Sequence, residues 1–311
     1  MRVVEELNAA LHALMEADEN VYVLGEDILD PYGGAFKVTK GLSARYTERV
    51  LTMPISESGL VGFALGLSLC GKTAIAEIMF GDFLTLAMDQ LLNQAAKVGW
   101  MSGDVLSAGL IVRTPMGGGR GYGPTHSQCI EKHFCGVPGL TVLAVNAFAS
   151  PGALLKKAYD LRSPVLFIEN KVMYSKAVEP ERIRRTSQPD VAILCYGGVA
   201  EACVRAAERL YGSEEIDTNV VVVEQLSPLD ARTVLDGVAG SDCIVTVEEG
   251  TQGWGFGAEC ARVMAEAGVR PRKFLCFAAP AMPIPSAREW ETAILPDERK
   301  IFEAVLNLVS S

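Results

Sequence analysis

The residue best placed for acid–base chemistry in this 311-residue chain is a glutamate at the start of an expected helix. In MPISESGLVGFALG, residues 53–66, Ser56 is suited to cap the helix, which places Glu57 in its first turn. Three glycines follow at positions i, i+3 and i+7 of one helical face. Each glycine costs a helix about 1 kcal/mol relative to alanine. This face therefore predicts the close approach of another backbone beside Glu57.

A second candidate is a histidine at the end of a glycine-rich loop. The stretch RTPMGGGRGYGPTHSQ, residues 113–128, contains five glycines in seven residues. This composition predicts a mobile loop after a strand, with His126 at the end of the loop. Histidine titrates near neutral pH and can serve as a general acid or base. The alternative is a surface histidine without a catalytic role. His12 and His133 lie in helical patterns and are interpreted as structural.

A third segment carries two aromatic residues where an expected strand turns into a helix. In IMFGDFLTLAMDQLLNQAAK, residues 78–97, these are Phe80 and Phe83. Ligands of α/β proteins commonly bind at the carboxyl ends of strands. We interpret Phe83 as a candidate ligand contact and Phe80 as a core aromatic.

Two phosphate-binding patterns are present, and neither has the context that phosphate binding requires. GLSLCGKT, residues 66–73, matches the G-x-x-x-x-G-K-T loop, but a helical pattern precedes it and a strand pattern follows. Phosphate loops need the opposite order, strand then helix. GWGFGA, residues 253–258, matches a dinucleotide fingerprint, but the next strand does not end in the acidic residue that would hold a ribose. We interpret it as a tight turn from strand to helix.

Composition, at 49% hydrophobic and 21% charged residues, indicates a soluble globular protein. The net charge of -10 argues against nucleic acid or an anionic membrane surface as partner. No apolar run reaches the roughly 20 residues of a membrane span. Eight cysteines form no C-x-x-C pair and three histidines do not cluster, which favours a reducing, cytoplasmic compartment and argues against a zinc site. Residues 1–18 predict an amphipathic helix rather than a signal peptide.

The elements that must position these residues alternate between strands and helices. This alternation predicts an α/β fold with two parallel-sheet domains: residues 1–175, a charged linker at 176–190, and residues 191–311. Expected strands lie at 20–26, 72–80, 108–114, 140–145, 164–170, 191–197, 219–225, 243–249 and 273–278. Expected helices lie at 56–69, 81–101, 149–161, 199–211, 231–240, 255–268 and 298–309.

Several motifs in a fixed order resemble one family. VLGED, GGAFKVTKGL, PISESGLVGFALG, HSQCIEKHF with VPGL, PVLFIEN with MY, and VEEGTQGWGFGAE span nearly the whole chain. The chain resembles the beta subunit of the thiamine-diphosphate-dependent first component of 2-oxoacid dehydrogenase complexes, such as pyruvate, branched-chain and acetoin dehydrogenases. That family implies a pyrimidine-binding domain followed by a transketolase C-terminal domain.

The resemblance assigns roles to individual residues. Glu57 matches the glutamate that hydrogen-bonds the aminopyrimidine ring of thiamine diphosphate, and there it would favour the imino tautomer that removes the thiazolium proton. Phe83 matches the aromatic residue that packs on the pyrimidine. His126 matches the histidine that serves the substrate and acyl transfer to a lipoyl group. Some relatives bind a monovalent cation such as K⁺ through backbone carbonyls. The matching residues of this chain are Leu110, Ala158, Leu161 and Ser163.

The resemblance also implies that half of the active site lies on another subunit. The family holds the diphosphate and Mg²⁺ through a G-D-G…N-N motif of an alpha subunit, and no G-D-G occurs here. The expected assembly is an α2β2 heterotetramer that decarboxylates a 2-oxoacid and passes the acyl unit to a lipoyl acyltransferase or a lipoyl or carrier-protein domain.

Three departures from the family keep alternatives open. Gly136 replaces a second family histidine, AVNA replaces a V-x-P-S motif, and GPTH at the histidine loop is similar to transketolases. One alternative is therefore a split transketolase-like ketol transferase that moves a two-carbon unit from a ketose phosphate to a lipoyl or carrier-protein thiol. The other is a non-catalytic scaffold subunit.

Overall fold

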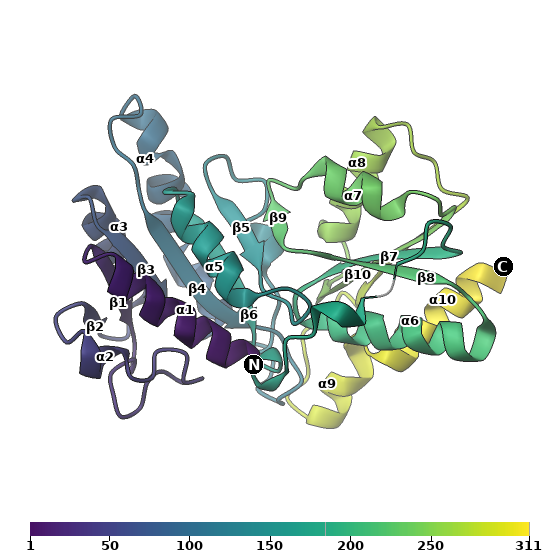
Figure 1. Ribbon diagram of the computed structural model, residues 1–311, viewed down its shortest axis with the longest axis horizontal. Helices are drawn as coiled ribbons and strands as arrows, with labels where there is room; N and C mark the ends of the chain where they lie inside the picture. Colours follow the sequence, from purple (N-terminus) through teal and green to yellow (C-terminus); the bar gives the residue numbers. More distant parts are fainter. Residues whose placement is uncertain (184, 311) are drawn as a thin grey trace.

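The computed structural model describes residues 1–183 and 185–310, and it confirms the α/β fold class. The chain forms a seven-stranded sheet and a four-stranded sheet, each covered by helices on both faces (Figure 1). We call the parts built around these sheets the first and second domains. None of the helices in these ranges is both long and apolar enough to cross a membrane.

The first sheet runs in the order β2-β1-β3-β4-β6-β5-β9. Its strands are buried on both faces by helices, which explains their continuous apolar sequences. Six strands are parallel, and β9 pairs antiparallel with β5. The strands are β1 (Val21–Gly25), β2 (Val50–Thr52), β3 (Thr73–Glu77), β4 (Leu110–Met116), β5 (Thr141–Ala144), β6 (Val165–Asn170) and β9 (Gln225–Ser227).

The second sheet is parallel throughout and runs in the order β11-β10-β7-β8. Its strands are β7 (Val191–Tyr196), β8 (Thr218–Val223), β10 (Cys243–Thr251) and β11 (Lys273–Ala279).

The longer helices follow the predicted apolar periodicity. Helices α1 and α5 cover one face of the first sheet, and α3 covers the other. The α-helices are α1 (Val3–Ala17), α2 (Leu42–Arg45), α3 (Glu57–Leu69), α4 (Ala96–Met101), α5 (Pro151–Asp160), α6 (Ala200–Glu214), α7 (Ala231–Val238), α8 (Phe256–Glu266), α9 (Arg288–Ile294) and α10 (Glu298–Ser310).

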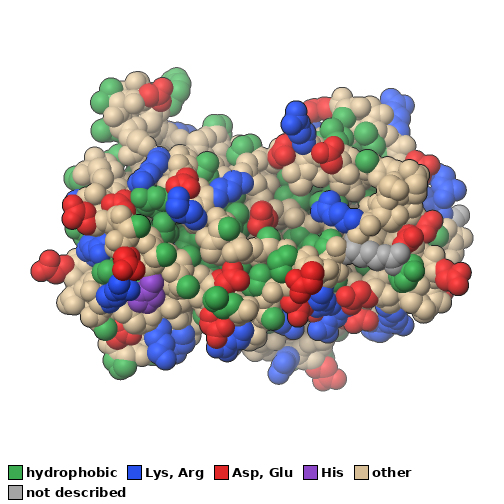
Figure 2. All heavy atoms as spheres, in the orientation of Figure 1, with side chains coloured by type: hydrophobic (Ala, Val, Ile, Leu, Met, Phe, Trp, Pro, Cys, Tyr) green, Lys and Arg blue, Asp and Glu red, His purple; other side chains and the backbone are tan. Residues whose placement is uncertain are grey.

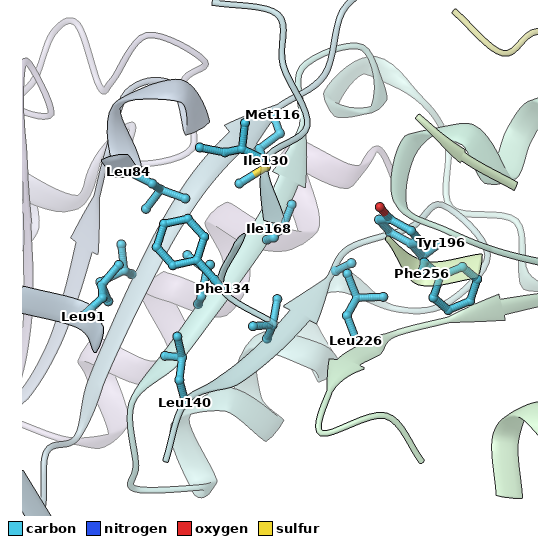
Figure 3. Packing of buried hydrophobic residues seen from close by; sticks show 14 of the residues in the cluster. Leu84, Leu91, Met116, Ile130, Phe134, Leu140, Ile168, Tyr196, Leu226 and Phe256 are labelled. Carbon is cyan, nitrogen blue, oxygen red and sulfur yellow. The ribbon is translucent and has the colours of Figure 1, made fainter. Parts of the chain in front are cut away.

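One hydrophobic core runs through both domains. Figure 3 shows it passing from Leu84 and Phe134 in the first domain to Tyr196 and Phe256 in the second. The chain also crosses between the sheets: the predicted strand at 219–225 divides into β8 of the second sheet and β9, which joins the first. The domains are therefore packed together rather than loosely tethered.

The predicted helix at 81–101 is not a single α-helix. It divides into a 3-10 segment η1 (Gly81–Ala87), a π-helical segment η2 (Gln90–Ala95) and α4. A side chain at Gly81 would lie 2.3 Å from Met116, and the Asp82 carboxylate accepts from the Gln128 amide, so tertiary contacts override local helix propensity. Strand β2 and helices α2 and α9 were also missed by the sequence prediction because each is short.

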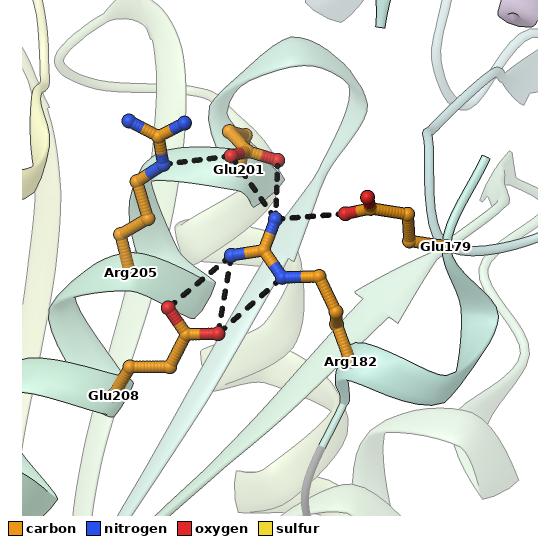
Figure 4. A network of polar contacts seen from close by, with 5 residues as sticks. All are labelled: Glu179, Arg182, Glu201, Arg205 and Glu208. Atoms are coloured by element: carbon orange, nitrogen blue, oxygen red, sulfur yellow. Dashed lines mark hydrogen bonds and ion pairs between the residues drawn. The ribbon is translucent and has the colours of Figure 1, made fainter. Parts of the chain in front are cut away.

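The predicted linker is held against the second domain. Figure 4 shows Arg182 donating to Glu179 of the linker and to Glu201 and Glu208 of α6, at 3.0, 3.3 and 3.1 Å. Two residues of the predicted ranges, Arg184 and Ser311, lie outside the described residues. The exact domain boundaries stay a prediction. On the face shown in Figure 2, acidic and basic side chains are interspersed rather than gathered by sign.

The interior of the first domain contains a buried ion cluster. Arg113 of β4 is 1% exposed and donates to Glu77 of β3 at 2.5 Å and to Glu169 of β6 at 2.7 Å. Glu169 also accepts from the Tyr174 hydroxyl. Burial raises the pKa of Glu169, and the Arg113 charge opposes that rise.

Replacing Arg113 should strongly destabilise the chain. Arg113→Met would leave two buried carboxylates without their cation, and breaking a buried pair in this way typically costs about 3–5 kcal/mol. Denaturant unfolding should show a large fall in the midpoint. Arg262→Ala removes two ion pairs on the surface of α8, with Glu259 and Glu266, and should leave the midpoint nearly unchanged. Equal midpoints for both variants would contradict this account.

Candidate active site

Three of the predicted site residues, Glu57, Phe83 and His126, lie at one edge of the first sheet. Strands β1, β3, β4 and β6 are neighbours and parallel, so their carboxyl ends meet at the same edge. The segments that follow these ends carry Glu26, Phe83, His126 and Lys171 respectively. This edge is where ligands bind in parallel α/β sheets.

Glu57 occupies the first turn of α3, as predicted. The Ser56 side chain accepts from the backbone N–H of Gly59 at 3.3 Å and caps the helix. The Glu57 side chain is only 6% exposed, and it lies close enough to Glu26 for their charges to interact. Burial and the neighbouring Glu57 charge raise the pKa of Glu26. The site thus contains two carboxyl groups whose charges interact.

The glycine face of α3 is open in this chain. A Cβ atom built on Gly66 would meet no described atom within 4 Å, and one on Gly62 would only reach Gln90 at 3.8 Å. Apolar side chains beside this face are exposed, with Ile55 at 86% and Phe63 at 48%. No described backbone of this chain makes the close approach that the glycines predict.

Phe83 and His126 are brought together by the fold. Their ring centroids lie 5.1 Å apart with an edge-to-face angle of 81°. The His126 ring also lies 5.0 Å from Phe80, and its Nδ1 is 3.0 Å from the Thr125 hydroxyl. His126 is partly buried, so the fold does not place it as an isolated surface residue.

Sequence reasoning missed three residues of this edge. Phe80 belongs to the aromatic cluster around His126 and is partly exposed, rather than being a core residue. Glu26 directly follows β1, and Lys171 directly follows β6. Both could have been predicted from sequence, because each directly follows an apolar strand and ligands commonly bind at the carboxyl ends of such strands.

Lys171 is a fully buried cation that contacts the histidine loop. Its Nζ donates to the backbone carbonyl of His126 at 2.7 Å, and its own carbonyl accepts from Arg120 at 2.9 Å. Burial lowers the pKa of Lys171, whereas the nearby Asp82, Glu249 and Glu291 charges act in the opposite direction.

The candidate cation residues lie away from this edge. Leu110 begins β4, Ala158 and Leu161 lie at the end of α5, and Ser163 precedes β6. They gather at the amino edge of the sheet, where the carbonyls of a helix C-terminus favour a cation. Among the described residues, no three His, Cys, Asp or Glu side chains are grouped so that they could hold a metal ion. The cation site stays a prediction.

Both phosphate-like patterns have the contexts expected from sequence. Helix α3 ends before Gly71, which has a φ of 81°, and β3 follows it. At 253–258 a strand leads into α8, but the Glu248 carboxylate already accepts from the N–H groups of Phe256 and Gly257. That helix N-terminus is therefore occupied by the chain's own side chain.

Comparisons with known proteins identify both domains. Residues 1–176 match the family model "Transketolase, pyrimidine binding domain", and residues 181–301 match "Transketolase, C-terminal domain". A split gene transketolase, described as an inactive beta4 tetramer, has a TM-score of 0.80 at 22% identity and covers 100% of this chain and 99% of its own, which shows a shared fold.

Relatives found by sequence similarity narrow the family further than the shared fold does. The chain is 33% identical to the pyruvate dehydrogenase E1 component subunit beta of Rhizobium meliloti, over 98% of this chain and 69% of the relative. It is 33% identical to the mitochondrial subunit beta-1 of Arabidopsis thaliana, over 98% and 88%. It is 32% identical to the acetoin:2,6-dichlorophenolindophenol oxidoreductase subunit beta of Cupriavidus necator, over 96% and 94%. These relatives favour the dehydrogenase interpretation over the ketol transferase. The chain therefore belongs to the thiamine-diphosphate-dependent transketolase superfamily, within the family of beta subunits of 2-oxoacid dehydrogenase first components.

Proposed function

We propose that this chain forms the beta half of an active site that decarboxylates a 2-oxoacid and transfers the acyl unit to a lipoyl group. The observation that carries the proposal is a buried carboxylate, Glu57, at the same strand-end edge as Phe83 and His126 and next to an open glycine face. Thiamine chemistry in this family needs a carboxylate, an aromatic ring and a histidine from this subunit.

The residues present fit the pyrimidine end of the cofactor. Glu57 would accept a hydrogen bond from the ring nitrogen para to the amine, and Phe83 would pack on the ring. When bound, thiamine diphosphate supplies a nucleophilic carbon and an electron sink. Glu57 would hold a proton at the ring nitrogen, and its buried setting would strengthen that interaction.

His126 would handle the substrate and the departing acyl unit. Its ring rests against Phe80 and Phe83 with Nδ1 toward Thr125, which leaves Nε2 available for proton transfer. Gly136 stands where the family has a second histidine, so His126 carries this task without that partner.

The partner in this proposal is an alpha subunit in an α2β2 assembly. It would supply the diphosphate and Mg²⁺ motif and the backbone that packs on the open glycine face of α3. A lipoyl acyltransferase would accept the acyl unit, and K⁺ would bind the backbone carbonyls of Leu110, Ala158, Leu161 and Ser163. We place the complex in a reducing, cytoplasmic compartment, since all eight cysteines carry free thiols.

The direct test is reconstitution with an alpha subunit that carries the G-D-G…N-N motif. The complex should acylate a lipoyl domain with pyruvate or a branched-chain 2-oxoacid as donor. Turnover of a ketose phosphate in place of every 2-oxoacid would support the ketol transferase instead. Absence of turnover with all donors, in a complex that binds cofactor, would support a scaffold.

The isolated chain should bind thiamine diphosphate weakly or not at all. The residues of this chain would contact only the pyrimidine end of the cofactor, and the diphosphate end is assigned to the partner. Calorimetric titration in Mg²⁺ should show no micromolar binding by the chain alone and clear binding by the complex. Micromolar, Mg²⁺-dependent binding by the chain alone would contradict the division of the site between two subunits.

A further inference from the structure

The glycine-rich loop that carries His126 is held by carboxylates of the second domain. The backbone N–H of Gly118 donates to Glu249 Oε1 at 2.6 Å. The backbone N–H of Gly121 donates to Glu291 Oε2 at 2.7 Å. Glu249 comes from β10 and Glu291 from α9, so two separate elements of the second domain reach the same loop.

The glycines of this loop allow the close approach. Gly117, Gly119 and Gly121 have φ values of 90°, 83° and 73°, a region that favours glycine. A Cβ on Gly118 would lie 2.6 Å from Leu295 and 2.8 Å from Glu291 Oε1. The glycine-rich composition therefore lets the backbone N–H groups of the loop approach the carboxylates at hydrogen-bonding distance.

Glu291 lies in the interior, and Glu249 is half-buried. Glu291 is 0% exposed, and its Oε1 has no hydrogen-bond partner in the described chain. Glu249 also accepts from the Asn170 side chain at 3.1 Å. Burial raises the pKa of Glu249, while the Gly118 N–H and the Lys171 charge oppose that rise. Buried charges of this kind are costly unless they are paired and hydrogen-bonded.

The first domain holds the other end of the loop through Lys171. Its Nζ binds the His126 carbonyl, and its carbonyl binds the Arg120 side chain. The loop is thus fixed at Gly118 and Gly121 by the second domain, and at Arg120 and His126 by the residue that follows β6. His126 lies five residues beyond Gly121, whose N–H is the nearer of the two that donate to these carboxylates.

We propose that Glu249 and Glu291 are positioning residues through which the second domain sets the geometry of His126. The inference rests on the function proposed above for His126. It gives the second domain a direct part in the active site, because two of its side chains hold the backbone that presents the histidine.

The test uses four variants and one matched control in the reconstituted complex. Glu249→Ala and Glu291→Ala remove the acceptors, whereas Glu249→Gln and Glu291→Gln keep an acceptor oxygen. Glu248→Ala is the control, since Glu248 is the adjacent residue of β10 but binds the start of α8 instead of the loop. Amide hydrogen exchange of peptides from 117–128, lipoyl-acylation kinetics, cofactor affinity and thermal unfolding are measured for each.

The alanine variants should speed exchange at the loop and lower kcat for acyl transfer by about 10- to 100-fold, the factor expected for a lost charge-assisted hydrogen bond. KM and cofactor affinity should stay within about twofold, since neither carboxylate is assigned to binding. The glutamine variants should recover most of the loss. Glu248→Ala should lower the unfolding temperature without changing loop exchange. If Glu291→Ala does not fold, Glu291→Leu fills the space and replaces it.

Two results would overturn the proposal. One is unchanged loop exchange in folded Glu249→Ala and Glu291→Ala complexes. The other is faster exchange with normal kcat, which would show that the held geometry does not serve catalysis. Failure of the proposed function looks different: His126→Ala would then turn over normally, whereas loop exchange in the carboxylate variants would still respond.

Discussion

Glu57→Gln should abolish turnover of the reconstituted complex, by about 10³-fold or more, with little loss of folding. Glutamine keeps the shape of the side chain but cannot hold a negative charge beside the pyrimidine ring nitrogen. The effect should be large because Glu57 is buried, where a charge is poorly screened by water. Exchange of the thiazolium proton should slow in parallel with turnover, and thermal unfolding should remain close to that of the native complex.

The matched control for this variant is Glu131→Gln. Glu131 is a buried carboxyl of the same domain, and burial raises its pKa to about 7. It accepts from the Tyr196 hydroxyl, and a glutamine amide oxygen can accept the same bond. Glu131→Gln should therefore retain turnover. A Glu57→Gln complex with near-normal rates would remove Glu57 from the mechanism.

His126→Ala should lower overall turnover by about 10²–10⁴-fold, the usual contribution of a general acid or base. Exchange of the thiazolium proton should be nearly unchanged, because that step is assigned to Glu57 and the cofactor's own amine. The two measurements together separate substrate handling from cofactor activation. Donor-dependent acylation of the lipoyl domain gives the first, and proton exchange of the bound cofactor gives the second.

The control for this variant is His133→Ala, since His133 is exposed in the short segment η3 (Glu131–His133). Turnover of that complex should be normal. Parallel losses of turnover and proton exchange in His126→Ala would mean that the histidine activates or positions the cofactor. Unchanged rates for both would make His126 a histidine without a catalytic role, despite its place in the aromatic cluster.

Most of the fold could be predicted from local patterns of apolar and β-branched residues. The strands at 108–114, 164–170 and 191–197 and the helix at 56–69 were predicted close to their observed bounds. Apolar periodicity and β-branched runs act over a few residues, so one sequence suffices to detect them. The irregular segment at 81–101 was mispredicted because its geometry depends on Met116 and Gln128, which lie far along the chain.

By itself, the sequence determined the order of strands and helices, the cap that places Glu57 in the first turn of α3, and the family to which the chain belongs. These depend on residues that are neighbours in the chain. Only the tertiary structure decided that Phe83 and His126 lie 5.1 Å apart, that β9 joins the first sheet, and that Glu291 binds the N–H of Gly121. Those contacts join residues that are between 43 and 170 positions apart. They form because packing of the two sheets around one shared core brings the segments together.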